Sequence, residues 1–95
     1  MSAYVVVQIE VTDPVKYEEY KKVVSPTIES YGGRDLVRGG TTETLEGDWN
    51  PGRCVILEFP DSEKARAWWS SEEYRIPKGI RHSAARSSLI VAHGL

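Results

Sequence analysis

Strand-like and helix-like segments alternate along this chain, and their order limits its possible folds more than any other feature. Alternating apolar and β-branched residues predict strands over 4–11, 34–38, 53–59 and 86–93. Apolar residues three and four positions apart predict a helix over 14–31 and another from 61 to 71. With right-handed crossovers, the order β-α-β-β-α-β yields a four-stranded antiparallel sheet with both helices on one face. We therefore predict an α+β, ferredoxin-like fold, formed by one domain over residues 1–95.

The two predicted helices begin with clear capping signals. Asp13 can accept hydrogen bonds from free backbone amides, and Pro14 suits the first helical position, where its missing donor costs nothing. Asp61 or Ser62 caps the second helix in the same way. Beyond that helix the apolar periodicity is lost, so we predict an irregular stretch over residues 72–85.

The strand over 4–11 is apolar on much of both faces. Val5 and Val7 point to one face, while Val6 points to the other, and Ile56 has the same outward position in a neighbouring strand. Strands with this pattern are usually covered on both sides. The two helices cover one side only, so a second copy of the chain is the simplest cover for the other. We therefore expect a homodimer.

The charge and composition of the chain argue against several classes of function. Twelve basic and fourteen acidic residues leave a net charge of −2, which disfavours binding to nucleic acid or to a membrane surface. A single cysteine, Cys54, excludes an intramolecular disulfide. The N-terminus lacks the charged-then-apolar pattern of a signal peptide, and no apolar run is long enough to span a bilayer. A cytoplasmic location is the expectation.

Six short motifs follow one another along nearly the whole chain. They are Asp13-Pro14, Tyr31-Gly32-Gly33, Arg38-Gly39-Gly40, Leu45-Glu46-Gly47, Glu58-Phe59-Pro60 and the run from Ala67 to Tyr74. In order and spacing they resemble the uncharacterised family catalogued as domain of unknown function 1330. The resemblance implies the dimeric α/β-barrel superfamily, in which two ferredoxin-like sheets pack face to face. Relatives there include cofactor-independent oxygenases, heme-handling enzymes, isomerases and ligand-sensing regulators, but the family itself has no established reaction.

Two arginines are candidates for binding an anion. Arg38 precedes Gly39 and Gly40, which allow a ligand to approach the backbone closely, and its guanidinium suits a carboxylate or phosphate. The alternative for Arg38 is a salt bridge to Glu46 across the adjacent hairpin. Arg81 lies where the family pattern also places an arginine, so the resemblance implies a second cation that can close a pocket opposite Arg38. Its alternative is a solvated, basic loop.

Three large aromatic residues are candidates for the wall of a pocket. Trp68 and Trp69 are adjacent on the second predicted helix, so their side chains point about 100° apart and cannot share one core. One of them packs inside, while the other lines a pocket or the dimer interface. Tyr74 follows shortly after. Packing in the core is the alternative for all three.

Proton-transfer candidates are few. His82 is one, because imidazole titrates near neutral pH, and Glu46 is the other. The two histidines and the lone cysteine have no ligand spacing, so no metal site is expected. The sequence lacks a phosphate loop, a dinucleotide fingerprint and a nucleophile elbow, so no cofactor is expected either.

Two functions are compatible with these residues. In the first, the chain is a cofactor-independent enzyme acting on a small anionic or aromatic molecule. Arg38 and Arg81 would anchor negative charge, the aromatic residues would shape the pocket, and Glu46 or His82 would move protons. In the second, the chain is a non-catalytic module that binds a metabolite or serves only for dimerisation.

Overall fold

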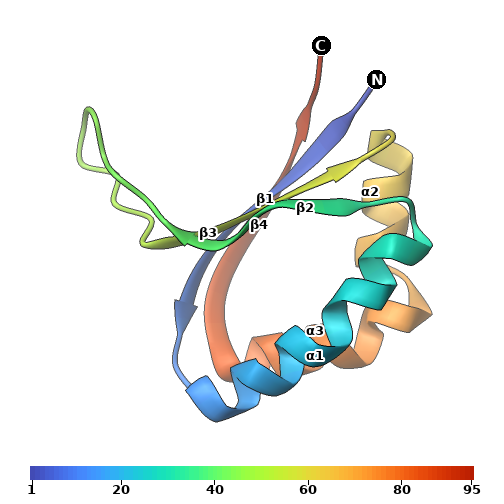
Figure 1. The fold of residues 1–95 in the computed structure, drawn as a ribbon, viewed down its shortest axis with the longest axis horizontal. Helices are drawn as coiled ribbons and strands as arrows, with labels where there is room; N and C mark the ends of the chain where they lie inside the picture. The colour runs from blue at the N-terminus through green and yellow to red at the C-terminus, as the bar shows by residue number, and fades with distance from the viewer.

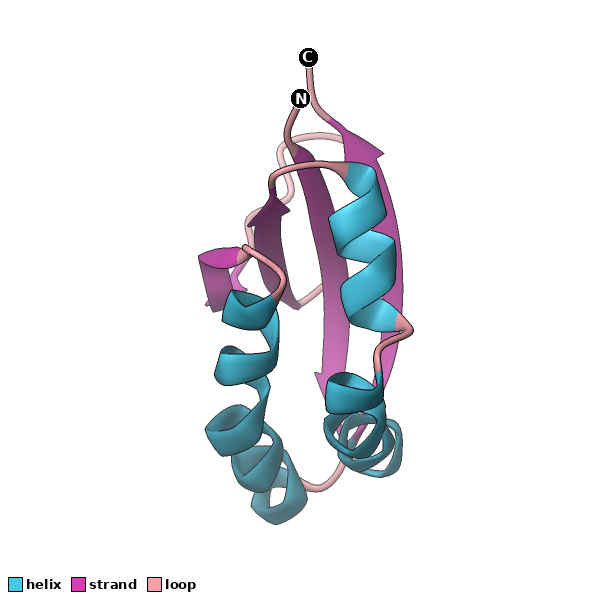
Figure 2. Ribbon diagram, turned by 90° about the vertical axis from the view of Figure 1, so that its right-hand side faces the viewer, coloured by secondary structure: helices cyan, strands magenta, loops and turns pink.

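The computed structural model describes all residues from Met1 to Leu95, and its elements follow the predicted order with one additional helix. They are β1 (Ala3–Val11), α1 (Pro14–Ser30), β2 (Arg34–Thr41), β3 (Arg53–Phe59), α2 (Ser62–Trp69), α3 (Glu72–Ala84) and β4 (Ala85–His93). The sheet order is β2-β3-β1-β4, with every neighbouring pair antiparallel. All three helices lie on one side of the sheet (Figures 1 and 2). The α+β, ferredoxin-like fold is thus confirmed.

The prediction of an irregular stretch over residues 72–85 is wrong, because most of it forms α3. The Ser71 hydroxyl caps this helix by accepting a hydrogen bond from the Tyr74 backbone N–H at 3.1 Å. The negative charges of Glu72 and Glu73 in the first turn stabilise the helix further, because they lie at the positive end of its dipole. Four buried residues, spaced three or four positions apart, pack the helix into the fold: Tyr74, Pro77, Arg81 and Ala84. This packing outweighs the helix-breaking tendency of the internal proline.

The core lies between the helices and the inner face of the sheet. Val5 of β1 lies opposite Leu57 of β3 and Val91 of β4, so the three side chains point toward the helices together. Phe59 and Trp68 are fully buried at the centre of this layer. Their ring centroids lie 5.6 Å apart, which attaches α2 to the end of β3.

The outer face of the sheet carries apolar residues at its centre, and no helix covers it. Val6 lies opposite both Ile56 on β3 and Ile90 on β4. The Ile90 side chain is 61% exposed. This face therefore exposes apolar side chains, as the sequence predicted, and such a surface usually packs against another molecule.

The connection between β2 and β3 projects away from the helices as a long arm over residues 42–52 (Figure 1). β2 itself continues to Thr41, beyond its predicted end at Arg38. The helices of the structure are all too short or too polar to cross a membrane.

Gly33, between α1 and β2, is expected to tolerate no side chain. A Cβ there would lie 2.6 Å from Cε1 of Phe59 and 2.7 Å from Cγ2 of Ile28, and both neighbours are buried. We expect Gly33→Ala to lower the free energy of unfolding by about 1–3 kcal/mol through overpacking.

Gly79 provides the matched control, because a Cβ there meets nothing within 4 Å and the residue lies inside α3. Gly79→Ala is expected to raise the free energy of unfolding by up to about 1 kcal/mol, since alanine favours a helix. Urea denaturation followed by circular dichroism measures both variants. Equal stability of the two would contradict the close packing at Gly33.

Candidate functional site

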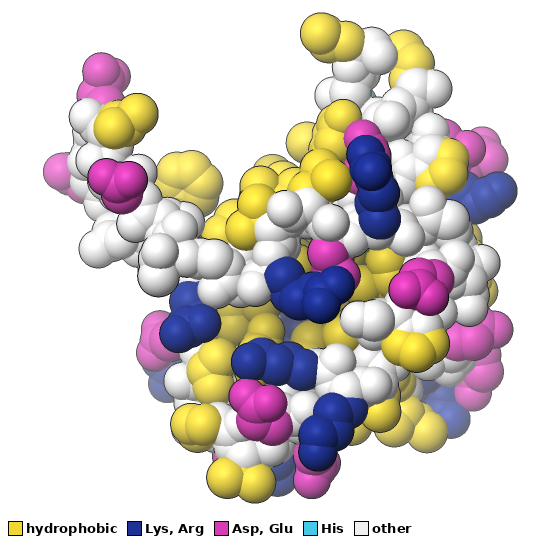
Figure 3. All heavy atoms as spheres, viewed as in Figure 1, with side chains coloured by type: hydrophobic (Ala, Val, Ile, Leu, Met, Phe, Trp, Pro, Cys, Tyr) yellow, Lys and Arg dark blue, Asp and Glu magenta, His cyan; other side chains and the backbone are white.

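A cavity of about 500 Å³ lies between α1 and the inner face of the sheet. Most of its wall is apolar and comes from both layers, including Val7, Val55 and Leu89 from the strands and Val24 and Ile28 from α1. Lys and Arg side chains gather around the hollow between α1 and strands β2 and β3 (Figure 3). An apolar cavity with a few charged groups at its edge is the usual form of a small-molecule site.

Arg81 enters the cavity from α3, and the residue as a whole is only 2% exposed. Its Nε donates a hydrogen bond to Tyr74 Oη at 3.1 Å, and its Nη1 donates to Ser87 Oγ. Its Nη2 lies 3.4 Å from Nε2 of His82. None of the four ion pairs of the protein includes Arg81. The cavity thus contains a buried positive charge whose hydrogen-bond partners are all uncharged.

The hydroxyl groups of Tyr20 and Tyr74 meet beside this guanidinium. Their oxygens lie 2.8 Å apart, and both side chains are buried and line the cavity. Burial raises the pKa of Tyr20 above its ordinary value of 10.0, and the neighbouring Tyr74 raises it further. Tyr20 therefore remains protonated and able to donate a hydrogen bond at neutral pH.

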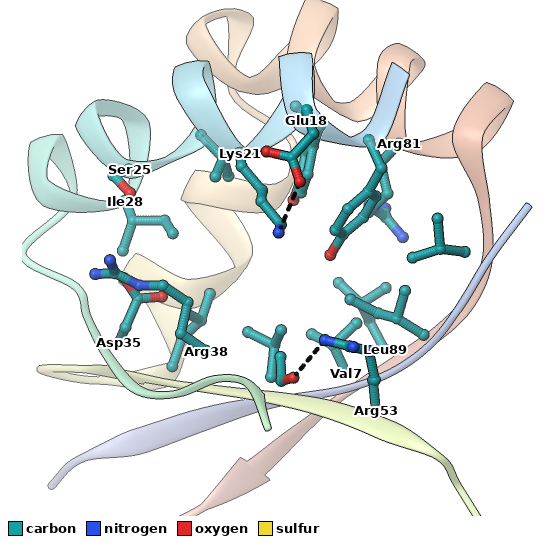
Figure 4. A pocket seen from close by; sticks show the side chains of 18 of the residues that line it. Val7, Glu18, Lys21, Ser25, Ile28, Asp35, Arg38, Arg53, Arg81 and Leu89 are labelled. Carbon is teal, nitrogen blue, oxygen red and sulfur yellow. Dashed lines mark hydrogen bonds and ion pairs between the residues drawn. The ribbon is translucent and has the colours of Figure 1, made fainter. Parts of the chain in front are cut away.

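The other cations at the cavity edge already have partners. Lys21 Nζ lies 3.1 Å from Glu18 Oε1, one turn away on α1. Arg53 donates to the backbone oxygen of Gly39 at 3.3 Å. Figure 4 shows Lys21 and Arg81 on the helical side of the cavity and Arg53 on the side of the sheet.

Arg38 pairs with Asp35 at 2.8 Å, and not with Glu46, the partner considered from the sequence. A register shift in β2 between Asp35 and Val37 explains this pair. In a regular strand, residues three positions apart point to opposite faces, whereas the extra residue of a bulge brings them to the same face. The Arg38 side chain remains 77% exposed, so it lies at the mouth of the cavity.

The structure brings four of the predicted site residues to this cavity: Arg38, Trp68, Tyr74 and Arg81. Trp69 instead lines a second cavity of about 350 Å³ between α2 and β4, where Lys78 Nζ lies 3.7 Å above its ring. Glu46 lies in the exposed arm and outside both cavities.

His82 lies next to Arg81 but is largely exposed and does not line the cavity. Because a guanidinium can only donate, Nε2 of His82 is the acceptor in their contact and the ring hydrogen lies on Nδ1. Desolvation lowers the pKa of His82 from 6.5, and the charges of Arg81 and Lys78 lower it further. The ring is therefore neutral at pH 7 and can accept a hydrogen bond from the Arg81 guanidinium.

The sequence analysis did not single out Tyr17 and Tyr20, which are among the regularly spaced residues that predict the helix α1. Both line the cavity. The signal available in the sequence was chemical, because a buried tyrosine needs a partner for its hydroxyl. Ser87 was missed as well, since nothing in the pattern of β4 marks it as the partner of Arg81.

Comparison with known families and proteins gives one match over almost the whole chain. The model of the family described as domain of unknown function (DUF1330) matches residues 2–95. No curated protein matches the sequence.

Several solved structures are similar in fold. A protein of unknown function from Rhodopseudomonas palustris has a TM-score of 0.79 at 20% identity, over 99% of this chain and 82% of that one. A dimeric ferredoxin-like protein of unknown function from Jannaschia sp. CCS1 has a TM-score of 0.74 at 14% identity, over 99% and 100%. SnoaB, a cofactor-independent oxygenase from Streptomyces nogalater, has a TM-score of 0.67 at 11% identity, over 99% and 93%. At these identities the likeness extends to the fold alone.

The lowered pKa of His82 can be measured by NMR. We expect the imidazole to titrate with a midpoint below 6.5, because desolvation and the two neighbouring cations disfavour its charged form. The folded state then binds this proton more weakly than the unfolded state. The contribution of His82 to stability is therefore lost as pH falls below 6.5 toward the folded pKa.

Lys78→Gln is expected to move the His82 midpoint part of the way back to 6.5. The charge of Lys78 is the smallest of the three effects that lower this pKa, after desolvation and the charge of Arg81. Lys64→Gln is the control, because Lys64 does not contribute to the shift. A His82 midpoint at or above 6.5 in the wild type would contradict the contact with Arg81.

Proposed function

The chain belongs to the family described as domain of unknown function (DUF1330), and we propose that it binds a small organic anion in the cavity between α1 and the sheet. Arg81 holds the anionic group. The observation that carries this proposal is the buried guanidinium without a carboxylate partner. A buried charge lacking an opposite charge costs a protein several kcal/mol, so such a group is rare without a purpose.

The charges around the cavity favour a ligand with a single negative charge. Asp35 neutralises Arg38 and Glu18 neutralises Lys21, and both pairs lie near solvent. Arg53 also lines the cavity without a carboxylate partner, but it is exposed, so Arg81 is the one buried cation left to be compensated. A carboxylate matches its planar donors better than a doubly charged phosphate, for which a second buried cation would be needed.

The remaining wall favours a ligand with an apolar or aromatic body. Trp68 and Tyr74 line the cavity with ring centroids 4.2 Å apart, and aliphatic side chains from the sheet lie opposite. The volume of about 500 Å³ lies within the range of roughly 300–1,000 Å³ that is usual for small-molecule sites. An aromatic or branched carboxylic acid therefore suits this site.

A cofactor-independent enzyme acting on such an anion is the second candidate. The buried hydroxyl pair beside a guanidinium favours it, because these donors can stabilise negative charge that develops on a substrate. SnoaB, described as a cofactor-independent oxygenase, has a similar fold, and this is an analogy of fold only. Recovery of a bound ligand unchanged after long incubation supports binding alone, whereas its conversion supports the enzyme.

We also propose that two copies of the chain pair through the outer faces of their sheets. The apolar face around Val6, Ile56 and Ile90 supports this arrangement. The similar protein from Jannaschia is described as dimeric. Each copy then retains its own cavity, on the side of the sheet away from the partner.

Replacing Arg81 tests the proposed anchor. In a thermal-shift screen of small carboxylates, phenols and phosphates, we expect an apolar carboxylate at about 100 times its Kd to stabilise the wild type by about 2.7 kcal/mol. Arg81→Met is expected to weaken this binding by about 10- to 100-fold, because it removes a charge-assisted pair. The melting temperature of the free variant is expected to equal or exceed that of the wild type, since a buried charge is removed.

Arg38→Ala is the matched control. Arg38 lies at the mouth of the cavity and is already paired with Asp35, so most of the ligand-induced shift is expected to remain. Full retention of the shift in Arg81→Met would contradict the role of Arg81. A shift that disappears only in Arg38→Ala would assign the anchor to Arg38 instead.

A charged residue on the outer face is expected to prevent pairing. Light scattering should give twice the chain mass of 10.7 kDa for the wild type and a single chain mass for Ile90→Arg, because arginine would be desolvated at the interface. Ile76→Arg is the control, since Ile76 is equally exposed but lies on α3. A wild-type monomer, or an Ile90→Arg variant that remains dimeric, would contradict this mode of pairing.

A further inference from the structure

We infer that the ligand is a 2-oxo carboxylic acid, and that the Tyr20–Tyr74 pair recognises the oxygen next to its carboxylate. This inference rests on the proposed binding of an anion by Arg81 and adds a second point of recognition to it. It follows from counting the hydrogens of the buried hydroxyl groups.

The two hydroxyl groups carry two hydrogens and share one hydrogen bond, 2.8 Å long. Only one of the hydrogens can lie between the two oxygens. The other contact of the pair comes from Arg81, whose Nε donates to Tyr74 Oη at 3.1 Å and so uses an acceptor site. One hydroxyl hydrogen is therefore left without an acceptor in the protein.

This count holds for either direction of the shared bond. If Tyr20 donates to Tyr74, the Tyr74 hydrogen is free. If Tyr74 donates to Tyr20, the Tyr20 hydrogen is free. Both residues line the cavity and are buried, with exposed fractions of 8% and 0%. A buried donor without a partner is costly, so the free hydrogen is best satisfied by an acceptor inside the cavity.

The position of the pair places that acceptor close to the anionic group. The Tyr74 oxygen is one hydrogen bond from the Arg81 guanidinium, and the Tyr20 oxygen is one further hydrogen bond away. The unused N–H groups of Arg81, one on Nη1 and one on Nη2, therefore lie close enough to the hydroxyl pair for one small ligand to reach both. An oxygen on the carbon next to the carboxylate is the acceptor that we infer.

A carbonyl oxygen fits this position better than a hydroxyl group. Arg81 and the free tyrosine hydrogen are all donors, and a carbonyl oxygen only accepts. A hydroxyl on the same carbon would bring a hydrogen of its own into the apolar cavity. Burial raises the pKa of Tyr20, so its hydroxyl stays a donor at neutral pH and does not become an acceptor by ionising.

Two pairs of acids that differ only at this carbon test the inference. Phenylpyruvate and 3-phenylpropanoate share a carbon skeleton and a charge, and only the first has the 2-oxo group. Pyruvate and propanoate repeat the comparison without the ring. By isothermal titration calorimetry at pH 7.5, we expect the 2-oxo acid of a pair to bind the wild type about 3- to 10-fold more tightly, the effect of one net hydrogen bond.

Variants of the two tyrosines assign this preference to the hydroxyl pair. Tyr20→Phe and Tyr74→Phe each leave one hydroxyl hydrogen, now released from the shared bond, so the 2-oxo acid is still preferred. The double variant has no hydroxyl, and the ratio of the two Kd values is expected to fall to about 1. Tyr31→Phe is the control, because the Tyr31 hydroxyl bonds Glu73 outside the cavity. Its ratio is expected to match the wild type.

The outcomes separate this inference from the proposed function. Equal Kd values for the two acids in the wild type, with binding lost in Arg81→Met, would overturn the inference and leave the anion site intact. A preference that survives in a folded double variant would also overturn it. Absence of binding for all four acids would overturn both proposals. The wild-type comparison needs no substitution, so it decides the question even if the double variant does not fold.

Discussion

The packing of Trp68 is the interaction on which the helical layer of this fold depends. Its ring lies 4.2 Å from that of Tyr74 and 5.6 Å from that of Phe59, measured between centroids. Its indole N–H donates to Thr27 Oγ1 at 3.0 Å. One buried side chain thus joins all three helices to β3, and its single polar atom is satisfied. In a chain of 95 residues, few other contacts can hold the layers together so effectively.

The site follows from this packing. Tyr74 is held against Trp68, and Arg81 lies two turns later on the same face of α3, where its Nε reaches the Tyr74 hydroxyl. The helix therefore holds the charged Arg81 side chain inside an apolar cavity, although a charged group is more stable in water. Such an arrangement sacrifices stability at one position, as is common where a protein binds a ligand.

Much of the fold could be predicted because its signals are local. A period of two marked the four strands, and the register of the sheet brings Val5, Leu57 and Val91 to one face as the alternation requires. The helix α3 could not be predicted in this way, because Pro77 and Gly79 are poor helix formers. The Ser71 cap and the packing of its buried face stabilise this helix. How much the packing contributes depends on the residues of other elements that it contacts, which the local sequence does not reveal.

By itself, the sequence determined the order of strands and helices, the two apolar faces of the sheet, and the family, since these depend on the spacing of residue types. It also pointed to Arg38, Tyr74 and Arg81 as parts of one site. Only the tertiary structure decided that Arg81 is buried without a counter-charge while Arg38 lies exposed beside Asp35. It likewise joined the hydroxyl of Tyr20 to that of Tyr74 across 54 positions of the chain. Burial and hydrogen-bond partners arise from contacts between distant segments, which local spacing does not encode.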